Sequence, residues 1–321
     1  MTKKLPKGTI KKLQKALAEY MHDSNSKKGK EILPLINSIN DVLNADESAK
    51  NDSPEKTNEQ LYLDNTVKTL IQLMPFFDQP TLNSLSTLLQ TTVRKYPDSS
   101  LPQYLMKNQT ELTTLLSFFD QPSVSNTAHM LLRACLLSRD FTKFLFDSGF
   151  VGSFIQYLSG DNFDKLTTAF GTYDAILNTH PDISADFVKS HWQLFQIQFK
   201  QLLNSPNYLV QSTFLPILLK FLTFDETKVC FMKYLDDVQN LQLIMILLKN
   251  SSSKKRKRVP SQAYNIFKLF VINPRRSPPI VNALKKNKTQ LLRFLNELKL
   301  EDSDPSLEEE KQQVISLISG F

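Results

Sequence analysis

The chain has 321 residues, 41% of them hydrophobic, and a net charge of +7. This length and core material suit one or two ordinary domains or one continuous solenoid. Its 7 glycines are too few for a phosphate-binding or strand-rich chain, and its 2 cysteines exclude a disulfide framework and a cysteine metal site. No apolar signal segment follows the basic N-terminus and no apolar run reaches about 18 residues, so we expect a soluble cytoplasmic protein, with the nucleus as a second location left open.

The first 58 residues are expected to form two helices and a linker. Apolar side chains recur at helical spacing from Gly8 to Met21 and again from Glu31 to Leu43. From Ala45 to Asn58 the residues are polar and charged, and a segment with nothing to bury is typical of a mobile linker. Residues 1–58 are therefore assigned to N-terminal helices and a linker.

The pentapeptide FFDQP organises the middle of the chain, because it occurs at Phe76–Pro80 and again, 42 residues later, at Phe118–Pro122. A second set of turn dipeptides has nearly the same spacing and lies at 97–98, 139–140, 181–182 and 224–225. A period of about 40–47 residues built from helix pairs is the signature of HEAT and armadillo repeats. Each repeat leaves an apolar face uncovered, so neighbours stack into a solenoid with a concave binding face. We therefore predict an all-α, armadillo/HEAT-like helical-repeat solenoid over residues 59–300.

Helical segments separated by proline and aspartate turns fill this region, and no strand is predicted. Asp78 or Thr81 is expected to cap the helix that follows the first FFDQP. After the repeats, an acidic stretch and a short apolar segment predict a capping helix within residues 301–321. The clearest helices are expected at Leu61–Met74, Leu82–Lys95, Gln103–Phe118, Asn162–Asn178, Ser184–Leu203 and Tyr208–Phe224.

The sequence has no motif for catalysis or for a cofactor. Glycine-rich phosphate loops, the nucleophile elbow and the zinc-protease motif are absent, and the four histidines are scattered. The segment from Asp23 fails as a calcium loop, because Gly29 stands at position 7 rather than 6 and Pro34 replaces the glutamate at position 12. The aspartates that recur with the repeat are interpreted as helix N-caps: Asp98, Asp140, Asp182 and Asp225. We expect a non-enzymatic protein without cofactor or metal.

Five consecutive cations form the sharpest short motif of the chain: Lys254, Lys255, Arg256, Lys257 and Arg258. Such a run cannot be buried, so it is expected to project into water. Two interpretations stay open for it. It is a nuclear-import signal or nucleic-acid patch, or it is a surface insertion between two helices.

Four segments carry a family resemblance: LLRACLLSRDFTKFLF (131–146), AFGTYDAILNTHPDISADFVKSHW (169–192), NLQLIMILLKN (240–250) and IFKLFVINPRRSPPIVNALKKNKTQLLRFL (266–295). With them the chain resembles a divergent, fungal-type member of the calcium-binding protein 39 ("mouse protein 25") scaffold family. The resemblance implies a curved armadillo-like scaffold. It also implies that the concave face binds a germinal-centre-type protein kinase or a related pseudokinase and holds it in the active conformation.

The resemblance further implies an apolar pocket near the C-terminal repeats that takes a partner's Trp-Glu-Phe tail. Residues in or near this pocket are matched by Tyr208, Ser212, Met245 and Lys286. The family has an arginine where this chain has Ser212, so we expect loss of a charge-assisted contact worth about 1.5–3 kcal/mol and weaker binding of an acidic tail. Pro216 replaces a basic residue one turn later and is expected to kink its helix.

Two concave-face positions also depart from the family. Asp225 and Lys228 stand where the family usually has arginine and phenylalanine. An arginine-to-aspartate change inverts the charge offered to a partner, so this surface is expected to have changed.

Three functions are therefore weighed. The leading one is a non-catalytic scaffold that binds and activates a kinase. The alternatives are a helical-repeat adaptor for a different, nuclear, protein partner and a basic helical-repeat nucleic-acid binder. The last would need lysines and arginines gathered in one concave stripe.

Overall fold

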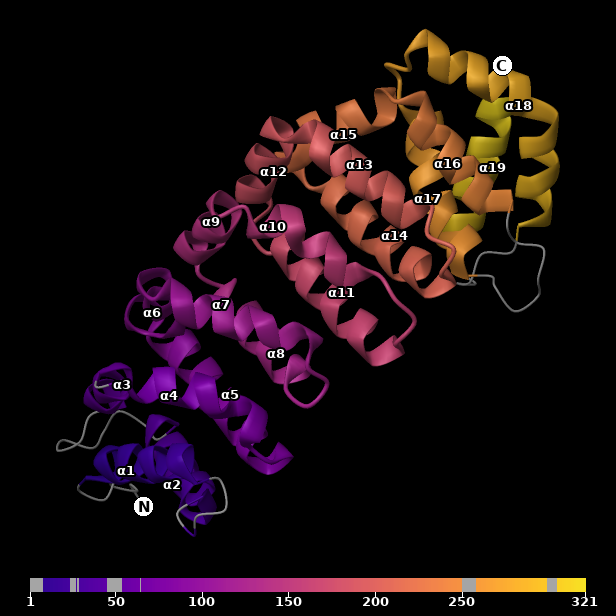
Figure 1. The fold of residues 1–321 in the computed structure, drawn as a ribbon. Helices are drawn as coiled ribbons and strands as arrows, with labels where there is room; N and C mark the ends of the chain where they lie inside the picture. The colour runs from indigo at the N-terminus through magenta and orange to yellow at the C-terminus, as the bar shows by residue number, and fades with distance from the viewer. Residues whose placement is uncertain are drawn as a thin grey trace. The chain divides into compact units, whose positions relative to one another are not determined.

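The structure is a computed structural model that describes residues 8–23, 27, 29–44, 54–63, 65–249, 258–298 and 305–321. These residues form α-helices and short 3-10 helices, and none of them lies in a strand (Figure 1). The predicted all-α helical-repeat solenoid is confirmed. By its internal contacts the chain divides into two compact units, Met1–Phe150 and Val151–Phe321.

The first unit is built by successive helices that pack on their counterparts in the next repeat. Helix α2 packs on α5 and α5 on α8, while α4 packs on α7 and α6 on α9. The N-terminal helix α1 packs on α2 and α4. Its helices are α1 (Thr9–His22), α2 (Gly29–Leu43), α3 (Pro54–Tyr62), α4 (Thr66–Leu73), α5 (Gln79–Lys95), α6 (Leu101–Lys107), α7 (Gln109–Ser117), α8 (Ser125–Cys135) and α9 (Arg139–Asp147). A four-residue helix, α10 (Phe150–Ser153), spans the boundary between the units.

The second unit repeats a long, a short and an intermediate helix. Helices α11, α12 and α13 have 16, 10 and 12 residues, and α14, α15 and α16 have 16, 9 and 12. The long helices α11, α14 and α17 pack in series, and α13 packs on α16 and α16 on α18. The bounds are α11 (Phe163–Asn178), α12 (Pro181–Ser190), α13 (Trp192–Leu203), α14 (Tyr208–Thr223), α15 (Lys228–Asp236), α16 (Val238–Lys249), α17 (Arg258–Ile272), α18 (Pro278–Glu297) and α19 (Pro305–Ser319).

Buried aromatic rings hold the long and intermediate helices of this unit together. The ring of Tyr173 on α11 stacks on Phe154 at 6.0 Å and lies 6.4 Å from Phe214 on α14. Phe199 on α13 contacts Phe214 and Phe221 at 5.5 and 6.3 Å. All five rings are almost wholly buried, and aromatic pairs of this kind add about 0.5–1.5 kcal/mol each beyond their buried area. This core fixes the frame on which α16 and α18 are placed.

The last helix closes the row of long helices, because α19 packs on both α17 and α18. Val314 and Ile318 are fully buried in this contact. Glu310 accepts a hydrogen bond from Lys268 Nζ of α17 at 2.9 Å, and Lys311 Nζ donates to the carbonyl oxygen of Leu298 at 3.1 Å. The buried side of α19 thus covers apolar surface of α17 and α18, while Glu309, Gln312 and Gln313 on its other side are exposed.

The two copies of FFDQP form different turns. In the first, Asp78 is the N-cap of α5, and its Oδ1 accepts from the backbone N–H of Thr81 at 3.0 Å. In the second, Asp120 lies in a 3-10 helix and α8 begins only at Ser125. The Ser125 hydroxyl donates to the carbonyl oxygen of Phe119 at 2.9 Å and holds this wider turn, whereas the equivalent residue of the first copy is Asn83. Of the two residues expected to cap this helix, Asp78 and Thr81, the N-cap is Asp78.

Three expected helices are each split in the structure. Ser184–Leu203 divides at His191 into the end of α12 and the whole of α13. Leu61–Met74 divides into α3 and α4 around Asn65, whose φ of 60° lies in the left-handed region that asparagine tolerates. Gln103–Phe118 divides at Asn108, whose side-chain amide donates to the carbonyl oxygen of Tyr104 at 2.8 Å and so ends α6. Helix α3 begins at Pro54, within the stretch expected as a linker, and residues 45–53 lie outside the described residues.

The periodic aspartates are not N-caps, contrary to our interpretation. Asp140 and Asp182 lie in the first turn of α9 and α12, and the hydroxyl of Ser138 caps α9. Asp98 and Asp225 lie in 3-10 helices. Negative charge in the first turn of an α-helix is favoured by the helix dipole, which gives Asp140 and Asp182 a structural role.

Candidate partner-binding pocket

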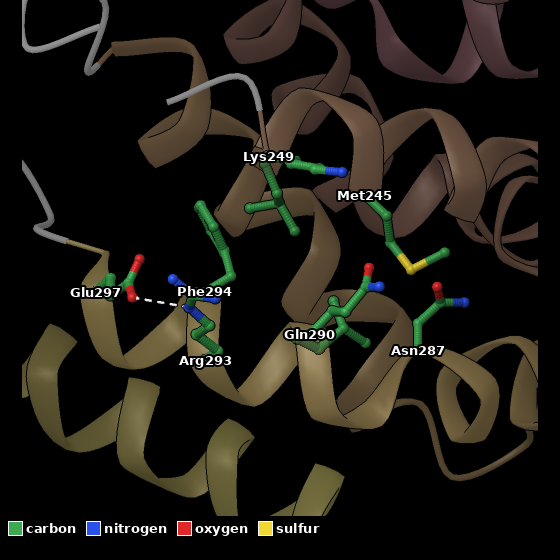
Figure 2. Close-up of a pocket in the computed structure, with 9 residues that line it drawn as sticks. Met245, Lys249, Asn287, Gln290, Arg293, Phe294 and Glu297 are labelled. Carbon is green, nitrogen blue, oxygen red and sulfur yellow. Dashed lines mark hydrogen bonds and ion pairs between the residues drawn. The ribbon is translucent and has the colours of Figure 1, made fainter. Parts of the chain in front are cut away.

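A pocket of about 630 Å³ opens between α16 and α18 in the second unit. Its apolar part is formed by Met245 and Leu248 of α16 and by Leu291 and Phe294 of α18 (Figure 2). Leu248 and Leu291 are buried and make the floor, whereas Met245 and Phe294 are half-buried and make the walls. Residues three and four apart share a helix face, so this spacing along both helices forms a continuous apolar surface.

Polar and charged side chains form the rim of the pocket. The rim residues are Lys249 of α16 and Asn287, Gln290, Arg293 and Glu297 of α18. Arg293 Nε donates to Glu297 Oε1 at 3.2 Å, one helical turn away. Two cations against one anion leave the rim with a net positive charge, so the pocket suits a ligand that joins an apolar side chain to an acidic group.

Of the four residues matched to the family's pocket, Met245 lines the cavity. Tyr208 and Ser212 are on α14, which packs on α17. The Tyr208 hydroxyl accepts a hydrogen bond from the backbone N–H of Val259 at 3.4 Å. Ser212 is 3% exposed, and its hydroxyl donates to the carbonyl oxygen of Leu209 at 3.1 Å. Neither of these two residues lines the pocket.

The fourth matched residue, Lys286, is exposed, and so are the three further positions at which the chain departs from the family. Lys286 directly precedes the pocket-lining Asn287 on α18 and points into solvent rather than lining the cavity. Pro216 is exposed, and α14 continues through it from Tyr208 to Thr223. Asp225 and Lys228 are exposed at the turn into α15 and lie outside the pocket lining.

The basic run lies largely beyond the structure. Lys254, Lys255, Arg256 and Lys257 are outside the described residues. Arg258 is exposed and is the first residue of α17. The nuclear-import interpretation therefore stays a prediction.

The titratable groups found in the interior are those of a packed core. Burial raises the pKa of the Cys135 thiol and that of the Cys230 thiol, so both stay protonated and unreactive at neutral pH. Burial, with a smaller contribution from Arg133, lowers the pKa of His129 to about 3, and its ring stacks on Phe119 at 3.8 Å. These groups serve packing rather than proton transfer.

Groups of three or more side chains able to hold a metal ion are absent from the described residues. Within those same residues, no helix combines the length and the apolar character that crossing a membrane requires.

Sequence reasoning missed most of the pocket. Arg293 and Phe294 belong to a segment that resembles the family and Glu297 lies just after it, yet none of the three was predicted as a site residue. The signal that could have found them is the α18 spacing of Asn287, Gln290 and Phe294, which places them on the face that meets α16.

Comparison with known proteins assigns the chain to a family. A family model described as Mo25-like matches residues 1–321. A Mo25-like protein of Schizosaccharomyces pombe is 27% identical over 262 residues, which cover 81% of this chain and 78% of that protein. The Calcium-binding protein 39-like protein of Homo sapiens is 24% identical over 308 residues, covering 94% and 90%. Among solved structures, an engineered protein has a TM-score of 0.54 with this chain, and the match covers 98% of this chain and 68% of the engineered one. At 14% sequence identity this is a likeness of fold alone. The chain belongs to the Mo25-like family, as a divergent member.

Proposed function

We propose that this protein is a non-catalytic scaffold that binds and activates a germinal-centre-type protein kinase or a related pseudokinase in the cytoplasm. Membership of the Mo25-like family supports a scaffold role. The observation that carries the proposal is the pocket of about 630 Å³ between α16 and α18, whose apolar walls and charged rim suit a peptide tail. The repeats of residues 59–300 supply the scaffold.

The pocket holds the aromatic end of the partner's tail. Met245 and Phe294 face the cavity from two helices and are half-buried, so a bound ring covers apolar surface that water now touches. Methionine suits this wall because its flexible thioether adapts to the edge of an aromatic ring. The charged rim contacts the acidic part of the tail.

A second contact is made by the surface that carries Asp225 and Lys228. Both side chains are exposed, and neither lines the pocket. Their charges differ from the arginine and phenylalanine of the resembled family, so the kinase partner of this chain presents a complementary, partly basic surface to Asp225. Removing one exposed charge at the edge of such a contact surface changes mainly the rate at which the partner associates and the salt dependence of that rate.

The pocket is tested with two neighbouring substitutions on α16. Met245→Ala removes a wall, whereas Ile246→Ala alters an exposed aliphatic side chain that does not line the cavity. Binding of a labelled Trp-Glu-Phe-ended peptide is measured by fluorescence anisotropy. We expect Met245→Ala to weaken binding at least tenfold and Ile246→Ala to leave it within about twofold. Equal affinities for both variants would remove the pocket from the proposal.

Activation is tested separately. A purified germinal-centre-type kinase is assayed for phosphorylation of a model substrate with and without the full chain. We expect higher kinase activity with the wild-type chain and a smaller increase with Asp225→Arg. If the rate of substrate phosphorylation were the same with and without a saturating concentration of the chain, the protein would bind the kinase without activating it.

A further inference from the structure

The charged end of the pocket holds one cation that is placed to bind a ligand. Figure 2 shows Met245 and Asn287 at one end of the cavity and the pair of Arg293 and Glu297 at the other. The Arg293 and Glu297 side chains are 81% and 66% exposed, and their contact is the single Nε–Oε1 pair at 3.2 Å. Most of the guanidinium edge is therefore directed at water rather than at protein.

The contact with Glu297 is weak enough to be replaced. Exposed ion pairs one helical turn apart add little stability, because solvent screens them. An arginine side chain presents a planar fork that can bind a carboxylate through two parallel hydrogen bonds. A ligand carboxylate bound through two such hydrogen bonds would make one more contact with the guanidinium than the single Nε–Oε1 contact of Glu297.

The length of the pocket sets the spacing within the ligand. Asn287 and Arg293 are six residues apart on α18, and Asn287 and Glu297 are ten apart, so these ends are separated by about 9–15 Å at about 1.5 Å per residue. An extended peptide covers that distance with about three or four residues. The ligand therefore carries its apolar side chain and its carboxylate within one short stretch of chain.

We propose that Arg293 is the specificity-determining residue of this pocket. It selects an extended segment of about three or four residues that places an aromatic or long aliphatic side chain between Met245 and Phe294 and a carboxylate on the Arg293 guanidinium. Glu297 competes with that carboxylate for the same guanidinium. This inference rests on the proposed function. In it, Arg293 takes the role of the arginine that the resembled family has where this chain has Ser212.

The experiment compares two matched cations on α18. Arg293 lines the pocket, whereas Lys285 is exposed on the same helix and does not line it. A fluorescein-labelled peptide ending in Trp-Glu-Phe is titrated with Arg293→Gln, Lys285→Gln and Glu297→Gln variants of the full chain. We expect affinity to fall about tenfold for Arg293→Gln, to change less than twofold for Lys285→Gln and to rise about twofold for Glu297→Gln. Circular dichroism checks that each variant is folded.

Altered peptides identify the carboxylate. A Trp-Gln-Phe peptide and a C-terminally amidated Trp-Glu-Phe peptide each remove one negative charge. We expect one of these two peptides to bind the wild-type chain about as weakly as the unmodified Trp-Glu-Phe peptide binds the Arg293→Gln variant. The affinity of that altered peptide should be the same for the wild-type chain and for the Arg293→Gln variant. Binding that depends on Met245 but not on Arg293 would overturn this inference alone. Absence of any wild-type binding would overturn it together with the role of the pocket.

Discussion

Introducing the family's arginine at Ser212 should destabilise the second unit. Ser212 is 3% exposed, and its hydroxyl donates to the Leu209 carbonyl within α14. It lies one turn after Tyr208, whose hydroxyl contacts Val259 at the start of α17. Residues four apart share a helix face, so an arginine at this position would enter the contact between α14 and α17.

The magnitude follows from overpacking. Extra atoms in a packed interior cost about 1–3 kcal/mol, and the guanidinium must reach solvent along its own stem. We expect about 2 kcal/mol for Ser212→Arg, which lowers the melting temperature of a unit of this size by about 4–8 °C. Differential scanning calorimetry of the full chain measures the shift.

Two controls separate packing from charge. Ser212→Ala loses one local hydrogen bond and is expected to stay within about 0.5 kcal/mol of wild type. Thr223→Arg adds the same side chain at the exposed C-terminal end of α14, where the helix dipole favours a cation. We expect the Thr223→Arg variant to melt near the wild-type temperature. A Ser212→Arg variant with that same melting temperature would show that burial of Ser212 does not exclude an arginine.

Two further predictions concern stability elsewhere. Asp78→Ala should cost about 1 kcal/mol in denaturant melts at neutral pH, because it removes the α5 cap, while Asp78→Asn should keep most of it. Hydrogen bonds from the Thr81 side chain and backbone hold the pKa of Asp78 below its ordinary 3.8, so the cap's contribution is present above that pH and the difference from Asp78→Ala should shrink as the pH falls through the lower folded-state pKa. Val314→Asp places a charge in the fully buried contact of α19 and should cost more than about 3 kcal/mol by the same melts, whereas Gln313→Asp on the exposed side should be near neutral.

The fold could be predicted because helical periodicity and the repeat period act over long stretches. The spacing of FFDQP predicted the solenoid class, and side-chain chemistry limited the cap of α5 to Asp78 or Thr81, of which the structure has Asp78. The breaks at Asn65, Asn108 and His191 could not be predicted, because they depend on single residues whose backbone conformation is set by packing. The second FFDQP differed for the same reason: Ser125 bonds to the Phe119 carbonyl, and the pentapeptide contains no trace of that contact.

The candidate site was predictable only in part. Met245 was placed at the pocket through the resemblance, and it lines the cavity in the structure. Ser212 was matched to a pocket position, yet the structure buries it in α14. Arg293 and Phe294 were missed because a helix pattern does not say which neighbour a half-exposed face will meet. That information is a property of the contact between α16 and α18.

The most direct measurement of the central claim is affinity capture followed by mass spectrometry, with the wild-type chain and with Met245→Asp and Ile246→Asp variants expressed at equal levels. The Ile246 variant controls for added charge on an exposed part of α16. The account predicts that a germinal-centre-type kinase or related pseudokinase is enriched with wild type and with Ile246→Asp and is lost with Met245→Asp. Recovery of the same proteins with all three chains, or of a set without any kinase or pseudokinase, would contradict it.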